Sequence, residues 1–194
     1  MKKVCTYLML LALLFALGAS ALLRQQHLAS QIIRLHILAN SDTAADQAAK
    51  LAVRDALLPE IEMLTADCTA RAEAAAALIE NSKRLGQLAA QTAGKRVTLR
   101  LSPEQYPTRR YDGFSLPAGE YLSLQIGIGE AAGRNWWCVA FPSVCTAAAA
   151  ADFEAVAVSG GLRGDDLRMM TEEEPDVKVR YLLLELISRL QKRF

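Results

Sequence analysis

Histidine is scarce in this chain of 194 residues, which contains only His27 and His36. No His-x-x-x-His or Cys-x-x-Cys pattern occurs, so zinc ligands at the usual spacing are missing and no cofactor is expected. The Gly-x-Ser-x-Gly sequence of a hydrolase nucleophile elbow is also absent. The net charge is only +1, whereas nucleic-acid binding requires a clustered basic surface. These absences argue against a metalloenzyme, an α/β-hydrolase and a nucleic-acid-binding protein.

The N-terminal 23 residues have the features of an export segment. Lys2 and Lys3 provide a positively charged start, and Val4–Leu17 is an apolar run without a charge. Ala19-Ser20-Ala21 then matches the small-x-small pattern that signal peptidase recognises. The segment is therefore predicted to carry the remaining chain out of the cytoplasm.

Two interpretations of this segment are open. Cleavage after Ala21 is favoured, because the small residues lie where a cleavage site should be. The apolar run also extends to Leu23, which gives 20 residues from Val4 and is long enough to cross a bilayer as a retained anchor. Either interpretation exports residues 24–194, which are expected to form a single domain.

Hydrophobic periodicity predicts the elements of this domain. Residues 32–39 alternate as a strand, with Ile33, Leu35 and Ile37 on one side and Arg34 and His36 on the other. A polar tether is expected before this strand at residues 24–30. A helix is expected from Thr43, which with Asp46 three residues on resembles a capping box, to about Leu58, where Pro59 should end or kink the run. A second helix is expected from Cys68 to Thr92, where Gly94 should end it.

Three further strands are predicted around residues 97–101, 121–128 and 136–141, because apolar and polar residues alternate there. The segment Gly127–Gly133 is rich in glycine but lacks the Lys-Ser/Thr ending of a phosphate-binding loop. It is therefore predicted to be a β-hairpin turn. A last, amphipathic helix is indicated by the spacing of Val179, Leu182, Leu183, Leu186, Ile187 and Leu190. The fold class is α+β, with a small, mostly antiparallel sheet packed by helices.

A hydrolase would have to use His36, Ser41 and Asp42, since a nucleophile needs a base and an orienting acid. These residues lie on the first predicted strand and its exit turn. Ser and Asp are the residues that most often cap helices. Asn40, Ser41 and Asp42 are therefore interpreted as a structural motif at the start of the helix, and His36 as a structural residue or a partner contact.

Trp136 and Trp137 are adjacent in a predicted strand, so their side chains should point to opposite faces of the sheet. Trp137 shares its face with Val139 and Phe141 and is expected in the core. Trp136 is then either covered by helices or available to a partner, since tryptophan is enriched at interface hot spots. With Arg34 and His36, it is a candidate for partner binding.

Export makes the cysteines relevant, because thiols outside the cytoplasm can form stable disulfides. Pro142 turns the chain after the last strand, which allows Cys145 to fold back towards Cys138. A bond between these two residues is expected in preference to two buried thiols, and Cys68 is not expected to take part. Because the loop is short, the gain in stability should be below the ~3 kcal/mol of a 15-residue loop.

Two blocks of sequence resemble the stage II sporulation protein R family. The first runs from Ile33 to Asp42 and continues through Asp46-Gln47 to Lys50 and Val53-Arg54-Asp55. The second comprises the following segments: Tyr111–Phe114, Leu116–Tyr121, Gly129-Glu130, Gly133 and Asn135–Val139, with Phe141-Pro142 and Cys145. Together they cover about residues 32–145.

The resemblance implies an exported, non-enzymatic signalling protein made in the forespore of a spore-forming bacterium. It would act between the forespore and mother-cell membranes on a membrane-bound aspartic protease that processes pro-sigma-E. The resemblance implies no catalytic residues. The competing class from the sequence is an exported hydrolase of cell-wall material, which would require a cleft with a perturbed acid or histidine.

Overall fold

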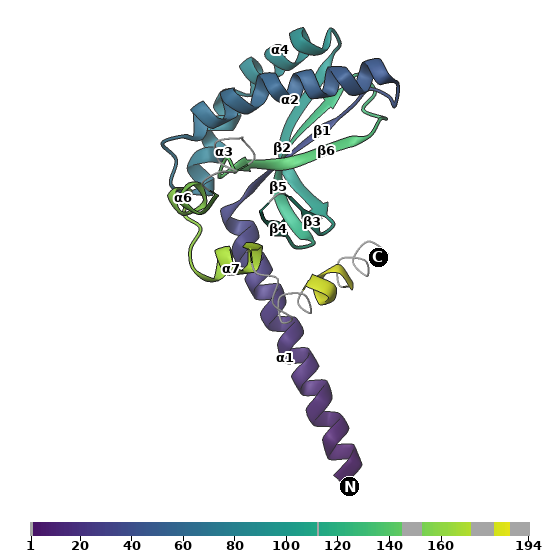
Figure 1. Cartoon of the computed structure of the whole chain (residues 1–194), viewed down its shortest axis with the longest axis vertical. Helices are drawn as coiled ribbons and strands as arrows, with labels where there is room; N and C mark the ends of the chain where they lie inside the picture. Colours follow the sequence, from purple (N-terminus) through teal and green to yellow (C-terminus); the bar gives the residue numbers. More distant parts are fainter. Residues whose placement is uncertain (1, 112, 145–152, 172–180, 187–194) are drawn as a thin grey trace. The chain divides into compact units, whose positions relative to one another are not determined.

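The computed structural model describes residues 2–111, 113–144, 153–171 and 181–186 (Figure 1). The chain divides into two compact units. The larger unit comprises Ser30–Glu104 and Tyr121–Arg163, and the smaller unit comprises Met1–Ala29, Gln105–Glu120 and Gly164–Phe194. Helices and a small mixed sheet coexist, so the predicted α+β class is confirmed.

A four-stranded sheet with the order β2-β5-β1-β6 organises the larger unit. Its strands are β1 (Ile33–Leu38), β2 (Val97–Tyr106), β5 (Gly119–Ile128) and β6 (Asn135–Phe141). β1 runs parallel to β5 and antiparallel to β6, which makes the sheet mixed. Because β1 lies between two other strands, the residues from Ile33 to Ile37 are all buried, as is usual for a central strand.

The helices of the larger unit cover one face of this sheet (Figure 1). They are α2 (Ala44–Thr65), α3 (Arg71–Glu80) and α4 (Ser82–Ala93). Ile33, Leu35 and Ile37 point into the core beneath them, as their alternation predicts. The core is completed by apolar residues of the helices and of β5, which include Val53, Leu57, Ile61, Leu78, Leu85, Leu124 and Ile126. The short helix α6 (Phe153–Ser159) also belongs to this unit.

Pro59 does not end the first helix, which was one of the two predicted outcomes, because α2 continues to Thr65 with Pro59 inside it. A proline within a helix removes one backbone hydrogen bond. Beyond it, however, α2 still buries Ile61 and Thr65. That burial outweighs the local loss, which illustrates how tertiary packing overrides propensity.

The predicted helix from Cys68 to Thr92 is divided into α3 and α4 at Asn81, whose side-chain amide donates to the Ala77 carbonyl. Its predicted end is confirmed, because Gly94 follows α4 with φ 60°. Glycine favours this left-handed conformation, since a β-carbon would be strained there.

The smaller unit contains most of α1 (Lys2–Gln31), a pair formed by β3 (Arg109–Arg110) and β4 (Ser115–Leu116), and α7 (Asp165–Thr171). The predicted polar tether at residues 24–30 is wrong, because α1 continues through this segment as a helix.

The predicted C-terminal helix is described at residues 181–186, which are helical. Leu184 is buried there, whereas Leu182 and Leu186, which belong to the predicted apolar stripe, are exposed. Tyr181 fixes this segment within the smaller unit, because its hydroxyl lies 2.7 Å from the Met169 carbonyl oxygen, to which it donates, and 3.1 Å from that of Ser115. Val179, Ile187 and Leu190 lie outside the described residues.

Candidate functional site

The turn between β1 and α2 is the centre of the candidate site. Thr43 is the N-cap of α2, and its Oγ1 accepts a hydrogen bond from the Asp46 backbone amide at 3.3 Å. The cap is therefore Thr43, as its capping-box spacing from Asp46 predicts, and not Ser41 or Asp42. Ser41 Oγ accepts a hydrogen bond from the Thr43 backbone amide at 3.3 Å. Side-chain hydroxyls therefore bind backbone amides both within the turn and at the start of α2.

Asp46, in the first turn of α2, gathers the polar groups of this turn. Its Oδ2 accepts hydrogen bonds from Asn40 Nδ2 at 2.7 Å and from Ser41 Oγ at 2.5 Å. Lys95 Nζ lies 3.8 Å from its other oxygen. The hydrogen bond from Asn40, followed by that from Ser41, lowers the pKa of Asp46 below its usual value, because both bonds favour the charged carboxylate.

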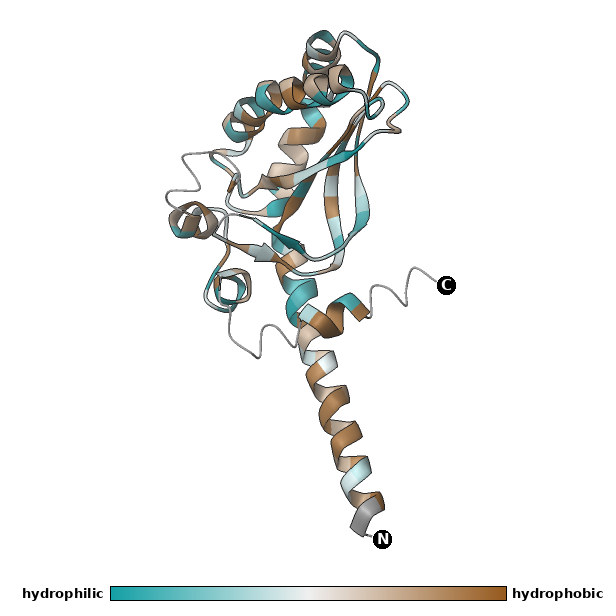
Figure 2. Cartoon of the chain, turned by 45° about the vertical axis from the view of Figure 1, so that its right-hand side comes forward, coloured by the Kyte–Doolittle hydropathy of each residue, from teal (hydrophilic) through white to brown (hydrophobic). Residues whose placement is uncertain are grey.

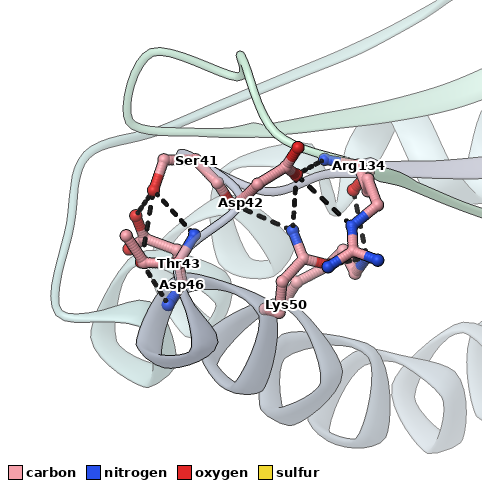
Figure 3. A network of polar contacts seen from close by, with 7 residues as sticks. Ser41, Asp42, Thr43, Asp46, Lys50 and Arg134 are labelled. Atoms are coloured by element: carbon pink, nitrogen blue, oxygen red, sulfur yellow. Dashed lines mark hydrogen bonds and ion pairs between the residues drawn. The ribbon is translucent and has the colours of Figure 1, made fainter.

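The same turn holds the loop between β5 and β6, which comprises residues 129–134 (Figure 3). Asp42 Oδ1 accepts from the Arg134 amide at 2.7 Å, and Asn40 Oδ1 accepts from the Glu130 amide at 3.1 Å. The Gly133 amide donates to the Ala39 carbonyl at 2.9 Å. We call residues 39–46 together with residues 129–134 the turn clamp.

The clamp corrects the prediction of a β-hairpin turn at Gly127–Gly133. β5 and β6 are not neighbours, because β1 lies between them. The connecting loop must therefore pass over the end of β1, where Asn40 and Asp42 bind its backbone amides. Residues of the two sequence blocks that lie about 90 positions apart in the chain, such as Asn40 and Glu130, therefore meet in this clamp.

Two glycines allow the loop to approach the turn this closely. A β-carbon on Gly133 would lie 2.3 Å from the Ser41 carbonyl oxygen. A β-carbon on Gly129 would lie 2.1 Å from Asn40 Oδ1, and Gly129 also has a φ of +58°. A side chain at Gly133 would push the loop off the backbone of the turn, and one at Gly129 would displace the Asn40 side chain that binds the loop.

Lys50 extends the clamp along the buried side of α2. Its Nζ donates to the Arg134 carbonyl at 3.0 Å and to Gln47 Oε1 at 2.7 Å. Gln47 in turn donates to the Ser41 carbonyl at 3.0 Å. Loss of water on burial lowers the pKa of Lys50, and the nearby charge of Arg134 adds to this effect.

The sequence analysis did not single out Asp46, Lys50 or Arg134 as site residues. In the first turns of α2, Ala45 is exposed, whereas the polar residues Asp46 and Lys50 are buried. Their spacing could have identified Asp46 and Lys50 as buried residues, because they lie one helical turn apart and on the same side of α2 as Val53 and Leu57.

The polar side chains of β1 form a second group, and the structure buries them. Arg34 is fully buried, and its Nε donates to the Cys138 carbonyl at 3.1 Å while its guanidinium lies 5.2 Å from the centre of the Tyr121 ring. His36 Nδ1 lies 2.8 Å from Glu104 Oε1. Arg34 and His36 therefore lie on the side of β1 opposite Ile33, Leu35 and Ile37, as the alternation predicts, but both side chains are buried.

The two tryptophans point to opposite faces, as predicted, but the assignment of the faces is wrong. Trp136 pairs with Ile37 and packs partly buried against the core under the helices. Trp137 pairs with His36 on the other face, with the two ring centres 5.5 Å apart. A register shift next to Phe141 moves that residue into the core while Val139 stays on the face of Trp137.

The predicted disulfide remains a prediction, because Cys145 lies outside the described residues. Cys138 is buried on β6, and Cys68 is a free thiol whose pKa is raised chiefly by burial. We expect a non-reduced digest of the exported protein to contain one peptide pair linked by Cys138 and Cys145. Free thiols at both positions in exported material would contradict this bond.

The lowered pKa of Asp46 predicts sensitivity to acid. A carboxyl whose folded pKa lies below its unfolded value stabilises the fold above that unfolded value, and the contribution is lost as the pH falls through the folded pKa. The loss should therefore begin near 3.8, the ordinary pKa of an aspartate, and grow at lower pH. Chemical unfolding of the wild type and Asp46→Asn at pH 6 and pH 3 measures it. The wild type should lose more stability than Asp46→Asn, whereas exposed Asp67→Asn should behave like the wild type.

The fold and site together define an α+β protein with a polar clamp beside a helix-covered sheet and with an N-terminal apolar helix compatible with export. A family model for stage II sporulation protein R matches residues 29–151. The chain belongs to the stage II sporulation protein R family.

The stage II sporulation protein R of Bacillus subtilis (strain 168) is 37% identical over 120 residues, which cover 59% of this chain and 54% of that protein. The chain thus spans about half the length of this curated relative. No solved structure matches the chain.

Proposed function

We propose that this protein is an exported signal of sporulation that activates a membrane-bound aspartic protease, which then processes pro-sigma-E. It would act as a ligand and not as a catalyst, in the space between the forespore and the mother cell. The observation that carries the proposal is the family match over residues 29–151, which contains the whole turn clamp. The N-terminal apolar helix supports export.

The geometry of the clamp favours a ligand over the alternative of an exported hydrolase. Ser41 Oγ donates to Asp46, and His36 is bonded to Glu104. A serine nucleophile needs a base within hydrogen-bonding reach, and these two side chains belong to separate networks. Ser41 thus has a structural role in holding the turn.

The protease contact is proposed at Trp136 and not at Arg34 or His36, which are buried. Trp136 is only partly buried, and the guanidinium of Arg54 lies 5.5 Å from the centre of its ring. Tryptophan and arginine are the residues most enriched at interface hot spots. The pair therefore offers a surface of the type that partners bind.

Co-expression of the chain with the protease and pro-sigma-E in a non-sporulating host tests the proposal. Processing should appear only when all three proteins are present. Absence of processing with an exported, folded chain would contradict the proposed function.

The contact surface is tested in the same assay with Trp136→Ala and its neighbour Trp137→Ala. A hot-spot tryptophan contributes more than about 2 kcal/mol, or over ~10-fold in affinity. Processing per folded protein should therefore fall about 10-fold or more for Trp136→Ala, and little for Trp137→Ala. Equal effects of the two substitutions would place the contact elsewhere.

Ser41→Ala separates the structural role of Ser41 from a catalytic one. The substitution removes a hydrogen bond to Asp46, which should cost about 1 kcal/mol of stability. Processing should decrease only in proportion to the folded fraction, measured by thermal unfolding. A fully folded Ser41→Ala protein without activity would revive the hydrolase alternative.

A further inference from the structure

Helix α1 consists of two parts with different surroundings. From Val4 to Leu17 its large apolar side chains are exposed, with Phe15 at 78% and Tyr7 at 69%. This part appears as the apolar end of α1 in Figure 2. From Ala21 onwards, one side of the same helix is buried, with Ala21 and Leu28 at 0% and Gln25 at 3% exposure.

The buried side of α1 is built into the smaller unit. Gln25 lies so close to Gly119 that a β-carbon there would be 2.0 Å from Gln25 Nε2. Arg24 and His27 lie 3.6 Å from Asp165 and Asp166 of α7, respectively. Residues 21, 25 and 28 follow the spacing of one helical face, so the contact face begins at Ala21 itself.

This arrangement bears on the predicted cleavage site Ala19-Ser20-Ala21. Proteolysis of a folded segment requires it to open locally first, and here the site lies within a continuous helix whose Ala21 is fully buried. Cleavage after Ala21 would remove the first residue of the contact face. It would also separate the packed part of α1 from the exposed apolar part.

We infer that α1 is retained as a membrane anchor whose last turns are part of the fold, with the exposed part occupied by the lipid bilayer. The inference rests on the export step of the proposed function. A helix of 20 residues is about 30 Å long, which matches the hydrocarbon core of a bilayer. Lys2 and Lys3 hold its N-terminus on the cytoplasmic side. The packed part of the smaller unit then begins at the outer surface of this bilayer, without a flexible tether.

The test compares the full chain with Ala19→Leu in a secretion-competent, non-sporulating bacterium. Ala19→Leu removes the small residue required for cleavage but leaves the buried face from Ala21 unchanged. A third chain, in which a cleaved signal peptide replaces residues 1–21, provides the soluble reference. For each chain, the intact mass, the membrane-bound fraction after a carbonate wash and the digestion by protease added to protoplasts are measured.

The wild type and Ala19→Leu should both keep their complete N-terminus, remain in the membrane and be digested from outside. A wild-type product beginning at Leu22, with Ala19→Leu intact, would overturn the anchor but leave export and the proposed function in place. A chain protected from external protease would overturn the anchor and the proposed function together. An intact wild-type chain released by carbonate would also overturn the anchor.

Discussion

Arg34→Ala is expected to lower the free energy of unfolding by about 3 kcal/mol or more, because the substitution leaves both a cavity and a buried carbonyl that loses its donor. The Arg34 side chain is fully buried, donates to the Cys138 carbonyl and lies over the Tyr121 ring. Urea unfolding followed by tryptophan fluorescence measures the loss. Exposed Arg96→Ala is the matched control and should change stability by less than ~0.5 kcal/mol.

Arg34→Met distinguishes the two contributions at this position. Methionine refills much of the volume without a charge, and buried ionic groups can often be replaced by apolar residues of similar size. If Arg34→Met is nearly as stable as the wild type, volume is the main contribution. A folded Arg34→Ala protein with unchanged stability and no protease activation would contradict the structural role and restore Arg34 as a partner contact.

Gly133→Ala is expected to destabilise the larger unit by about 1–3 kcal/mol, the usual cost of overpacking. The added β-carbon would lie 2.3 Å from the Ser41 carbonyl oxygen, and that atom belongs to the backbone, which cannot rotate away. The loop would have to move off the turn, which would lengthen the bond between the Gly133 amide and the Ala39 carbonyl. Thermal unfolding and amide hydrogen exchange at residues 129–134 measure this effect.

Gly86→Ala provides a control with the opposite sign. Gly86 lies within α4 and has nothing within 4 Å of its β-carbon position. Alanine is favoured over glycine inside a helix by about 0.5–1 kcal/mol, so this substitution should raise stability. If Gly133→Ala were also neutral or stabilising, the close approach of loop and turn would be refuted.

Local sequence patterns predicted much of the larger unit. The alternation in β1 identified Ile33, Leu35 and Ile37 as core residues, and the structure confirms all three. Gly94 ends α4 as expected, and Thr43 caps α2 with the Asp46 amide. These features depend on residues close together in the chain, which is why periodicity and capping rules find them.

The position of β1 within the sheet could not be obtained in this way. Alternation shows that a strand has two faces, but it does not show whether the strand is central or which face the helices cover. Arg34 and His36 were therefore expected on an open face, and Trp137 in the core. The burial of Arg34 and His36 and the pairing of Trp137 with His36 reverse both expectations.

Sequence patterns were enough to predict the apolar N-terminal segment, the α+β class, the family blocks and the core side of β1. Each of these follows from composition, short-range periodicity or a continuous motif. The passage of the loop at 129–134 over the end of β1, and its binding to Asn40 and Asp42, became apparent only in the folded chain. That contact joins residues about 90 positions apart. It depends on strand order, because β1 lies between β5 and β6 and the loop that connects them must pass over the end of β1. There the backbone amides of the loop need acceptors, which Asn40 and Asp42 supply.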